Sequence, residues 1–386
     1  MLKDTSKRMT EKVIIVIPTY NEAQVITQTI TQLEQVFAKI DATKYEMHIL
    51  ICDSNSPDRT ADIVKQLQSQ YQNLHLIIEP QKSGLGAAYM QAITYAIDKL
   101  NADIVFEFDA DGSHQPKYLP AMLDEFTHGA DVVVGSRYVK GGRIPSDWGI
   151  DRKILSGGGN LIARLFLTWK YKDFTSGFRG TRATLLKKIA LNKLLSKSYA
   201  YKLHLFWLLH KARAKIIEYP IEFIDRKIGY SKFPKNNICE SLKVVTLLRY
   251  YELKRYIQLC LVGLVGMIVQ LILFNLLRLI HIPAVLANLI GIEIAIISTF
   301  ILNNIFTFKD YKMTREHGIK HITKKFTQFN LCSIGSILIQ TGLLALSIAI
   351  FGIGFWRENI TVFVGIIIGS IINYFIYSRW IWKVKS

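Results

Sequence analysis

Two aspartates, Asp109 and Asp111, are the residues of this sequence best suited by type and spacing to do chemistry. Carboxylates separated by one residue can hold a hard divalent cation such as Mg²⁺ or Mn²⁺. A cation held in this way can bind a diphosphate. The same pattern also occurs in solvated turns, where an aspartate bonds to its own backbone. The pair directly follows an apolar run, and this position favours the metal-binding interpretation.

The elements that would position this pair belong to an alternating pattern in the first 250 or so residues. Strands are predicted at 13–18, 47–53, 74–79, 104–109 and 132–134, and helices at 22–39, 60–70 and 84–100. This alternation predicts an α/β fold with a mostly parallel sheet, built from βαβ units. Ligands of such sheets bind outside the carboxyl ends of the strands. Tyr20, Glu22, Asp53 and the acidic pair all fall there, so we expect one site at that edge.

The remainder of the chain is apolar and indicates a membrane domain. Of all residues 50% are hydrophobic, and apolar runs occupy 257–277, 285–308, 329–351 and 360–381. Each run approaches the ~20 residues that cross a bilayer, which predicts four spans. Lysines and arginines gather before the first span, between the second and third, and in the tail. The positive-inside rule therefore predicts a multi-pass protein of the cell membrane whose N-terminal domain and both termini are cytoplasmic.

The net charge and the cysteines indicate which binding partners and cofactors to expect. The net charge of +18 suits anionic lipid or a phosphate-rich substrate, and with membrane spans present we expect no nucleic-acid role. The four cysteines lack metal-ligand spacing and predict no disulfide framework. Residues 1–12 are polar and charged, so no cleavable signal peptide is expected.

An ordered series of segments resembles a known family. The segments are Ile17-Pro18-Thr19-Tyr20-Asn21-Glu22, Asp53-Ser54-Asn55-Ser56-Pro57-Asp58-Arg59-Thr60, Asp109-Ala110-Asp111, Gly135-Ser136-Arg137-Tyr138, Ser176-Gly177-Phe178 and Asp225-Arg226 with Ser231-Lys232. The series is similar to dolichyl-phosphate mannose synthases and their polyprenyl-phosphate relatives, which are family 2 glycosyltransferases of the GT-A fold. The C-terminal part resembles GtrA-like four-helix domains. We therefore expect a GT-A domain over 1–235, an interfacial helix or linker over 236–255 and a membrane domain over 256–386.

The resemblance implies a nucleotide-sugar site and a metal site. The donor would contact Pro18, Tyr20, Glu22, Cys52, Asp53, Lys82, Asp109, Ala110, Arg226 and Lys232. Mg²⁺ or Mn²⁺ would bind Asp109 and Asp111, with Ser113 nearby. Many relatives carry a longer side chain at position 113, so a water would bridge the serine to the metal if it takes part.

The resemblance also implies an acceptor site for a polyprenyl or dolichyl phosphate. Arg137, Arg152 and Ser231 are its candidates, because guanidinium groups bind phosphate bidentately. With Asp111, the two arginines are the expected catalytic residues. A lipid phosphate is already ionised near neutral pH, so the burden of catalysis is positioning and charge stabilisation. Direct displacement would invert the anomeric centre and give a β-linked lipid sugar.

Several alternatives remain open at this point. The leading donor is GDP-mannose, and the alternatives are glucose or N-acetylglucosamine from a UDP-sugar, or a membrane domain that mainly translocates a glycolipid. Relatives carry a carboxylate at the position of His204, which is either a site residue here or a buried structural histidine. Residues 192–210 and 241–255 form either interfacial helices or amphipathic core helices. Gly365 and Gly369 have the spacing of a helix-packing motif. Polyprenol length and oligomeric state are not encoded in these patterns.

Overall fold

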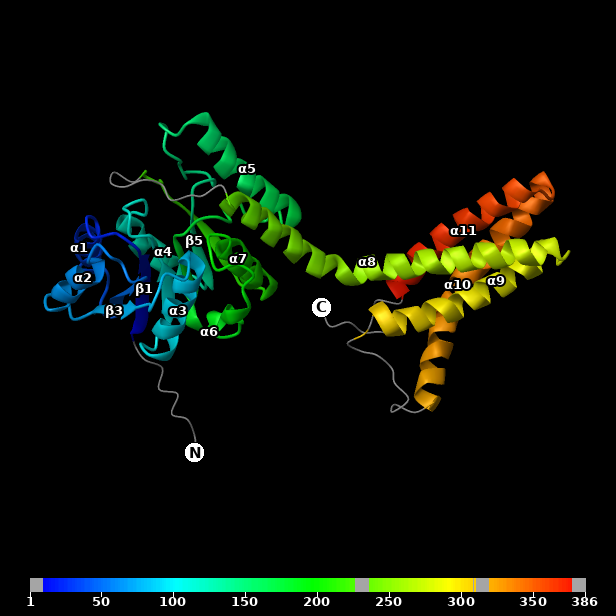
Figure 1. The fold of residues 1–386 in the computed structure, drawn as a ribbon, viewed down its shortest axis with the longest axis horizontal. Coiled ribbons are helices and arrows are strands. Elements are labelled where there is room, and N and C mark those ends of the chain that lie inside the picture. The colour runs from blue at the N-terminus through cyan, green and yellow to red at the C-terminus, as the bar shows by residue number, and fades with distance from the viewer. Residues whose placement is uncertain (1–9, 226–235, 308, 310–318, 377–386) are drawn as a thin grey trace. The chain divides into compact units, whose positions relative to one another are not determined.

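A continuous apolar run makes β1 (Glu11–Thr19) an inner strand of the N-terminal sheet. The side chains from Val13 to Ile17 are all fully buried in the computed structural model, as expected for a strand covered on both faces. The structure describes residues 10–225, 236–307, 309 and 319–376 (Figure 1). The chain forms two compact units, Met1–Arg249 and Tyr250–Ser386.

The first unit contains a seven-stranded sheet with the strand order β3-β2-β1-β4-β6-β5-β7. The other strands are β2 (Tyr45–Asp53), β3 (Leu74–Ile78), β4 (Ile104–Glu107), β5 (Val132–Ser136), β6 (Arg179–Arg182) and β7 (Ile216–Pro220). The α-helices are α1 (Ile26–Phe37), α2 (Thr60–Gln68), α3 (Leu85–Asp98), α4 (Leu119–Thr127), α5 (Ile150–Phe166), α6 (Ala183–Leu186) and α7 (Tyr201–Lys211). Short 3₁₀ turns occupy Pro116–Tyr118 and Leu191–Lys193.

The predicted mostly parallel sheet is confirmed, with one reversal. Strands β1, β2, β3 and β4 run parallel, as do β5 and β7, whereas β6 is antiparallel to both β4 and β5. All five predicted strands are present. Strands β6 and β7 and helices α4, α5 and α6 were not predicted. Strand β6 reads Arg-Gly-Thr-Arg and lacks an apolar alternation, because Gly180 leaves room for the ring of Phe106 and Arg179 is buried against Glu107.

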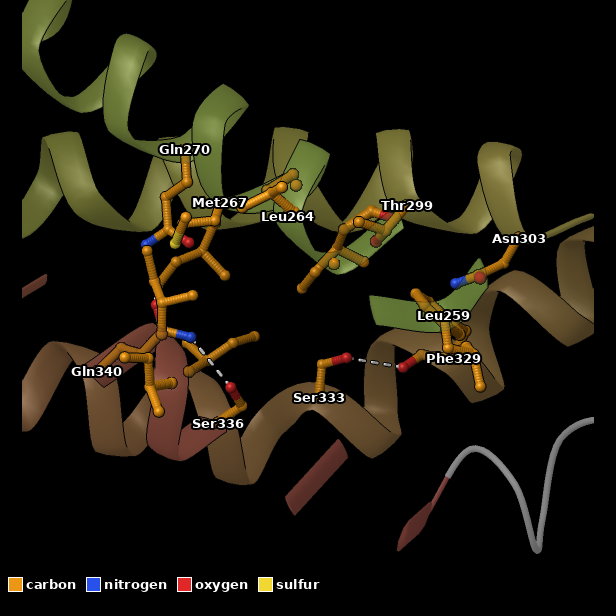
Figure 2. Close-up of a pocket in the computed structure, with 18 of the residues that line it drawn as sticks. Leu259, Leu264, Met267, Gln270, Thr299, Asn303, Phe329, Ser333, Ser336 and Gln340 are labelled. Atoms are coloured by element: carbon orange, nitrogen blue, oxygen red, sulfur yellow. Dashed lines mark hydrogen bonds between the residues drawn. The ribbon is translucent and has the colours of Figure 1, made fainter. Parts of the chain in front are cut away.

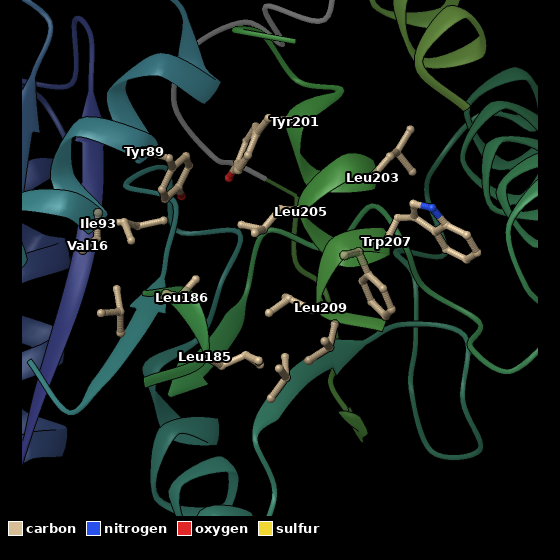
Figure 3. Close-up of a cluster of buried hydrophobic side chains, with 14 of the residues drawn as sticks. Val16, Tyr89, Ile93, Leu185, Leu186, Tyr201, Leu203, Leu205, Trp207 and Leu209 are labelled. Atoms are coloured by element: carbon tan, nitrogen blue, oxygen red, sulfur yellow. The ribbon is translucent and has the colours of Figure 1, made fainter. Parts of the chain in front are cut away.

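Two hydrophobic cores cover the two faces of the sheet. One contains residues of α3 and α7, and the other contains residues of α1 and α4. Figure 3 shows side chains of α7 such as Leu205 and Leu209 in the first core, together with Val16 of β1 and Ile93 of α3. Helix α7 is therefore a core helix. The interfacial alternative for residues 192–210 is wrong over this helix, because side chains are buried on nearly all of its sides.

The second unit consists of apolar helices. The chain enters it through α8 (Asn236–Leu279), whose first turns include residues 241–255, and continues with α9 (Ala284–Leu302), a π-helical turn (Asn303–Thr307), α10 (Ile319–Phe351) and α11 (Phe355–Ile376). In the described residues three stretches are long and apolar enough to span a membrane: Asn237–Leu279, Ala284–Thr307 and Ile322–Phe351. The fourth predicted span, 360–381, extends beyond the described residues, so the number of passes remains a prediction.

Polar side chains inside this unit bond to one another around a cavity of about 520 Å³ (Figure 2). Gln270 on α8 donates to Gln340 on α10 (2.8 Å), and Gln340 donates to Ser336 (3.0 Å). The predicted packing role of Gly365 and Gly369 is confirmed. A methyl group at Gly365 would lie 3.1 Å from Cα of Gln340, and one at Gly369 would collide with Ser336.

Candidate active site

The acidic pair lies just past the carboxyl end of β4, where the sequence predicted it. Phe108 and Ala110 are buried (0% and 4% exposed), whereas the Asp109 side chain between them keeps 29% of its surface exposed. This alternation is the pattern of a strand continued for a few residues. The core therefore holds the apolar members of the segment and leaves the carboxylates at the edge of the sheet.

Asp109 is held by groups from three different segments. The hydroxyl of Tyr89 on α3 donates to its Oδ1 (2.9 Å), and its backbone N–H donates to Nδ1 of His114 (3.0 Å). Its Oδ2 lies 3.6 Å from Nε2 of His114 and 3.7 Å from Nζ of Lys202 on α7. The first aspartate thus has one oxygen fixed by a tyrosine and the other facing two nitrogen-bearing side chains.

His114 is a part of this site that sequence reasoning missed, although it ends the acidic segment. Its ring stacks on Phe178 with 5.4 Å between ring centres, and its side chain is almost fully buried. Burial lowers the pKa of His114, the carboxylate of Asp109 opposing this shift. Because Nδ1 accepts from the Asp109 backbone, the neutral ring carries its hydrogen on Nε2, facing Asp109.

Asp111 and Ser113 form a tight turn together. The backbone N–H of Ser113 donates to Oδ1 of Asp111 (3.1 Å), and Gly112 between them has a φ of +75° that favours glycine. The Ser113 side chain is buried (3% exposed). Ser113 therefore supports Asp111 through its backbone, and a direct role as metal ligand remains a prediction.

The donor set fits a divalent cation of the Mg²⁺ type. Two carboxylates supply hard oxygen ligands, and the described residues contain no group of three His, Cys, Asp or Glu side chains arranged to hold a metal. Mg²⁺ sites commonly use one or two carboxylates and complete the shell with water and substrate phosphate. Asp109 and Asp111 match such an open site better than a closed structural one.

Asp53, expected to bind the nucleotide, is engaged by the protein itself. Its carboxylate is fully buried and accepts from Thr19 Oγ1 (2.8 Å), from the Ser56 backbone N–H (2.8 Å) and from Ser56 Oγ (2.7 Å). Cys52 beside it is equally buried, and burial raises the pKa of its thiol to about 12. Asp53 thus ties the end of β1 to the loop after β2.

The loop after β2 is also hydrogen-bonded to the turn that contains Tyr20 and Glu22. The Glu22 backbone N–H donates to Thr60 Oγ1 (3.0 Å), and the Ala23 N–H donates to Asp58 (3.0 Å). Thr60 in turn donates its hydroxyl to Asp58 (2.5 Å). These bonds order the two segments that contain the expected donor contacts Tyr20, Glu22 and Asp53.

Lys82 and Glu79 complete this edge of the sheet. The ammonium of Lys82 lies 3.6 Å from the ring centre of Tyr20, a cation–π contact. Glu79 was not predicted. It is buried after β3 and accepts hydroxyl hydrogens from Ser54 and Ser83, both at 2.5 Å. Lys82 therefore covers the ring of Tyr20, which the sequence analysis assigned to the donor site, while Glu79 anchors the loops on either side.

Arg137 forms a buried ion pair that the sequence did not predict. Its Nε and Nη2 donate to the two oxygens of Asp173 (both 2.7 Å), and Nη2 also donates to Thr175 (2.7 Å). Burial alone would raise the pKa of Asp173, but the guanidinium outweighs it and the pKa is lowered. Two of the donors that we expected to grip an acceptor phosphate are thus bonded to the protein.

Arg152, on the first turn of α5, is more accessible. It pairs with Asp225 at 2.5 Å and 3.0 Å, lies 4.2 Å from the ring centre of Trp148, and keeps 37% of its side chain exposed. The remaining predicted site residues, Arg226, Ser231 and Lys232, lie outside the described residues.

The segment from Asp173 to Phe178 brings the two halves of the site together. Thr175 bonds to Arg137 at one end, and Gly177 at the other end packs against Asp109 and His114. A methyl group at Gly177 would lie 2.9 Å from Oδ2 of Asp109 and would collide with Lys202. Glycine at this position leaves the contact open, which accounts for the glycine of the Ser-Gly-Phe motif.

His204 bonds to the loop that precedes its own helix. Its Nδ1 accepts the backbone N–H of Leu195 (3.0 Å), and burial lowers the pKa of His204 to about 4. A neutral, buried imidazole that holds a loop favours the structural interpretation.

Two protein families match different parts of the chain. Residues 14–190 match "Glycosyl transferase family 2", and residues 258–382 match "GtrA/DPMS, transmembrane domain". The first match covers most of the sheet and the acidic pair. The second begins about halfway along α8 and includes the apolar helices that follow.

Curated proteins are similar over most of their own length. Polyprenol monophosphomannose synthase of Mycolicibacterium smegmatis is 34% identical over 61% of this chain and 86% of its own. Undecaprenyl-phosphate mannosyltransferase of Micrococcus luteus is 34% identical over 61% of this chain and 93% of its own. Dolichol-phosphate mannosyltransferase of Pyrococcus furiosus is 31% identical over 78% of this chain and 82% of its own.

Proposed function

Because the chain belongs to the dolichyl-phosphate/polyprenyl-phosphate mannose synthases, family 2 glycosyltransferases of the GT-A fold, here with a GtrA-like membrane domain, we propose that it transfers mannose to a polyprenyl phosphate. The donor is GDP-mannose, and the product is a β-linked lipid sugar formed at the cytoplasmic membrane face. The observation that carries this proposal is the acidic pair at the end of β4 in a chain that also carries membrane-spanning helices.

Asp109 and Asp111 would hold Mg²⁺ or Mn²⁺, which supplies positive charge to the departing diphosphate when it is bound. The residues around them supply rigidity: Tyr89 fixes Oδ1 of Asp109, and the Ser113 backbone fixes Oδ1 of Asp111. Fixed ligands cost no reorganisation during the reaction, which is the main physical source of electrostatic catalysis.

The nucleophile is an oxygen of the acceptor phosphate. It attacks the anomeric carbon while the bond from that carbon to the diphosphate oxygen breaks, and attack from the opposite face inverts the centre. A phosphate monoester ionises with a second pKa near ~6 and needs no general base. Arg152, with its exposed side chain, is the phosphate ligand that we favour. Arg137 holds the Asp173–Phe178 segment in place through Asp173 and Thr175.

Helix α5 supports a lipid-borne acceptor. Its exposed side chains are unusually apolar, as shown by Ile150 (76% exposed), Ile154 (67%) and Leu165 (55%), with Trp169 (56%) just beyond. Arg152 and Lys153 lie on the first turn of the same helix. An exposed apolar face flanked by basic residues suits the headgroup region of a bilayer. Since the chain itself carries membrane-spanning helices, the occupant of this face is the membrane surface.

A donor panel tests the proposal. The full chain in detergent is supplied with polyprenyl phosphate, Mn²⁺ and GDP-mannose, UDP-glucose or UDP-N-acetylglucosamine in parallel. We expect lipid-linked mannose from GDP-mannose alone, lost at least 10³-fold in Asp111→Ala but retained in Asp62→Ala, an exposed aspartate on α2. Transfer from a UDP-sugar would replace the donor assignment, and full activity of Asp111→Ala would contradict the metal role.

A further inference from the structure

Lys202 is a lysine inside a hydrophobic core helix, and no role in the family resemblance explains it. Its side chain is 3% exposed, and its neighbours on α7, including Tyr201, Leu203 and Leu205, are equally buried. Burying an ammonium is costly unless an anion compensates it. In the described residues the ion pair of Lys202 is with Oδ2 of Asp109 at 3.7 Å, which is longer than a hydrogen bond.

The surroundings of Lys202 place its Nζ between the two halves of the site. Asp109 lies on one side. The ring centre of Tyr199 lies 5.0 Å from Nζ, and the Tyr199 hydroxyl donates to the Thr175 carbonyl (3.0 Å). Thr175 also accepts from Arg137. The Nζ also lies against the open side of Gly177, where any side chain would collide with it.

The charges around Asp109 and Asp111 suggest a role for the Lys202 ammonium. Two carboxylates and one divalent cation together carry no net charge, so the metal site alone does not offset the negative charge of a bound phosphate. Lys202 adds one positive charge at the centre of the group, in an environment where water screens it little. Both substrates of the proposed reaction carry phosphate, and the diphosphate gains negative charge as it leaves. A buried positive charge beside Asp109 matches that change.

We propose that Nζ of Lys202 binds a phosphate oxygen of a substrate, either on the diphosphate of the donor or on the lipid acceptor. This proposal rests on the proposed function and adds a catalytic residue to it. In the absence of substrate the ammonium is balanced by Asp109, and on binding it is shared with the phosphate.

The test compares Lys202→Met with Lys202→Arg and with Lys211→Met, an exposed lysine at the end of the same helix. Thermal unfolding identifies variants that fold. We expect Lys202→Met to lower kcat/KM about 10- to 100-fold, as for loss of a charge-assisted hydrogen bond, while Lys211→Met stays within about twofold. Lys202→Arg should recover part of the loss because it keeps the charge.

Calorimetric binding of GDP in the presence of Mn²⁺ separates the two sources of phosphate. Weaker GDP binding by Lys202→Met assigns the contact to the donor. Unchanged GDP binding with a raised KM for polyprenyl phosphate assigns it to the acceptor. If folded Lys202→Met matches Lys211→Met in both measurements, the inference is wrong although mannose transfer stands. If the wild type transfers no mannose, the proposed function fails instead, and the GDP measurement still tests the donor contact.

Discussion

The hydroxyl of Tyr89 donates to Oδ1 of Asp109 at 2.9 Å, and this contact decides which oxygen of the first aspartate faces the reaction site. Tyr89 is fully buried, and burial, together with the nearby carboxylates, raises the pKa of its hydroxyl well above the ordinary value. The tyrosine therefore remains a proton donor at any working pH. Oδ2 is left toward His114 and Lys202.

Replacing Tyr89 with Phe should lower kcat about 5- to 20-fold and raise the Mn²⁺ concentration needed for half-maximal activity. The ring keeps its stacking on Tyr201, so the fold is retained, while Oδ1 of Asp109 and the Phe108 carbonyl both lose the hydroxyl. Metal titration of transfer activity measures both effects. Tyr95→Phe, on the same helix, is the control, and an unchanged metal requirement in Tyr89→Phe would contradict the positioning role.

Asp173→Asn should destabilise the protein by about 3–5 kcal/mol, because it leaves the buried Arg137 guanidinium without its counter-charge. Chemical unfolding followed by fluorescence measures this loss. Asp62→Asn removes an exposed ion pair with Lys65 and should change the free energy of unfolding by less than about 1 kcal/mol. A similarly small effect for Asp173→Asn would show that the ion pair contributes little.

His204 should make the protein less stable in mild acid. Its pKa is about 4 in the folded chain and ~6.5 when unfolded, so the unfolded state binds more protons between these values. Stability is complete above the unfolded pKa and falls as the pH drops toward 4, by ~2 kcal/mol at pH 5. His204→Gln keeps an acceptor for Leu195 but cannot titrate. Its melting temperature should therefore fall less than that of the wild type between pH 7.5 and pH 5, and equal falls would contradict the assignment.

The apolar face of α5 should matter only when the acceptor lies in a membrane. Ile154→Ser with Leu165→Ser removes exposed side chains, so the melting temperature should change little. Transfer to a long polyprenyl phosphate in vesicles should drop several-fold, while transfer to a short-chain acceptor in detergent is retained. Leu195→Ser, another exposed leucine, is the control. Equal loss in both assays would point to a folding defect rather than to membrane contact.

The sequence predicted the parallel part of the sheet because its strands are plain apolar runs between helical stretches. It did not predict β6, because a strand reading Arg-Gly-Thr-Arg has no such run. Arg179 is buried there by its bond to Glu107, a partner 72 residues away. Long-range compensation of this kind leaves no local pattern in the chain.

The residues of the candidate site also fall into those that could be predicted from the sequence and those that could not. Asp109 and Asp111 could be found because they are adjacent in sequence and follow a strand. Asp173, Glu79 and Lys202 could not, because each is defined by a partner from another segment: Arg137, Ser54 and Asp109 respectively. Arg137 looked like a free phosphate ligand only because its counter-ion was unknown.

The hydrogen bonds to the Asp53 carboxylate matter for any attempt to change which nucleotide-sugar the protein uses. The Asp53 carboxylate is fully buried and accepts three hydrogen bonds from Thr19 and Ser56, so changing it would loosen two segments at once instead of only exchanging one nucleotide for another. Lys82, whose ammonium lies 3.6 Å from the ring centre of Tyr20, is the position at this edge that we would vary instead.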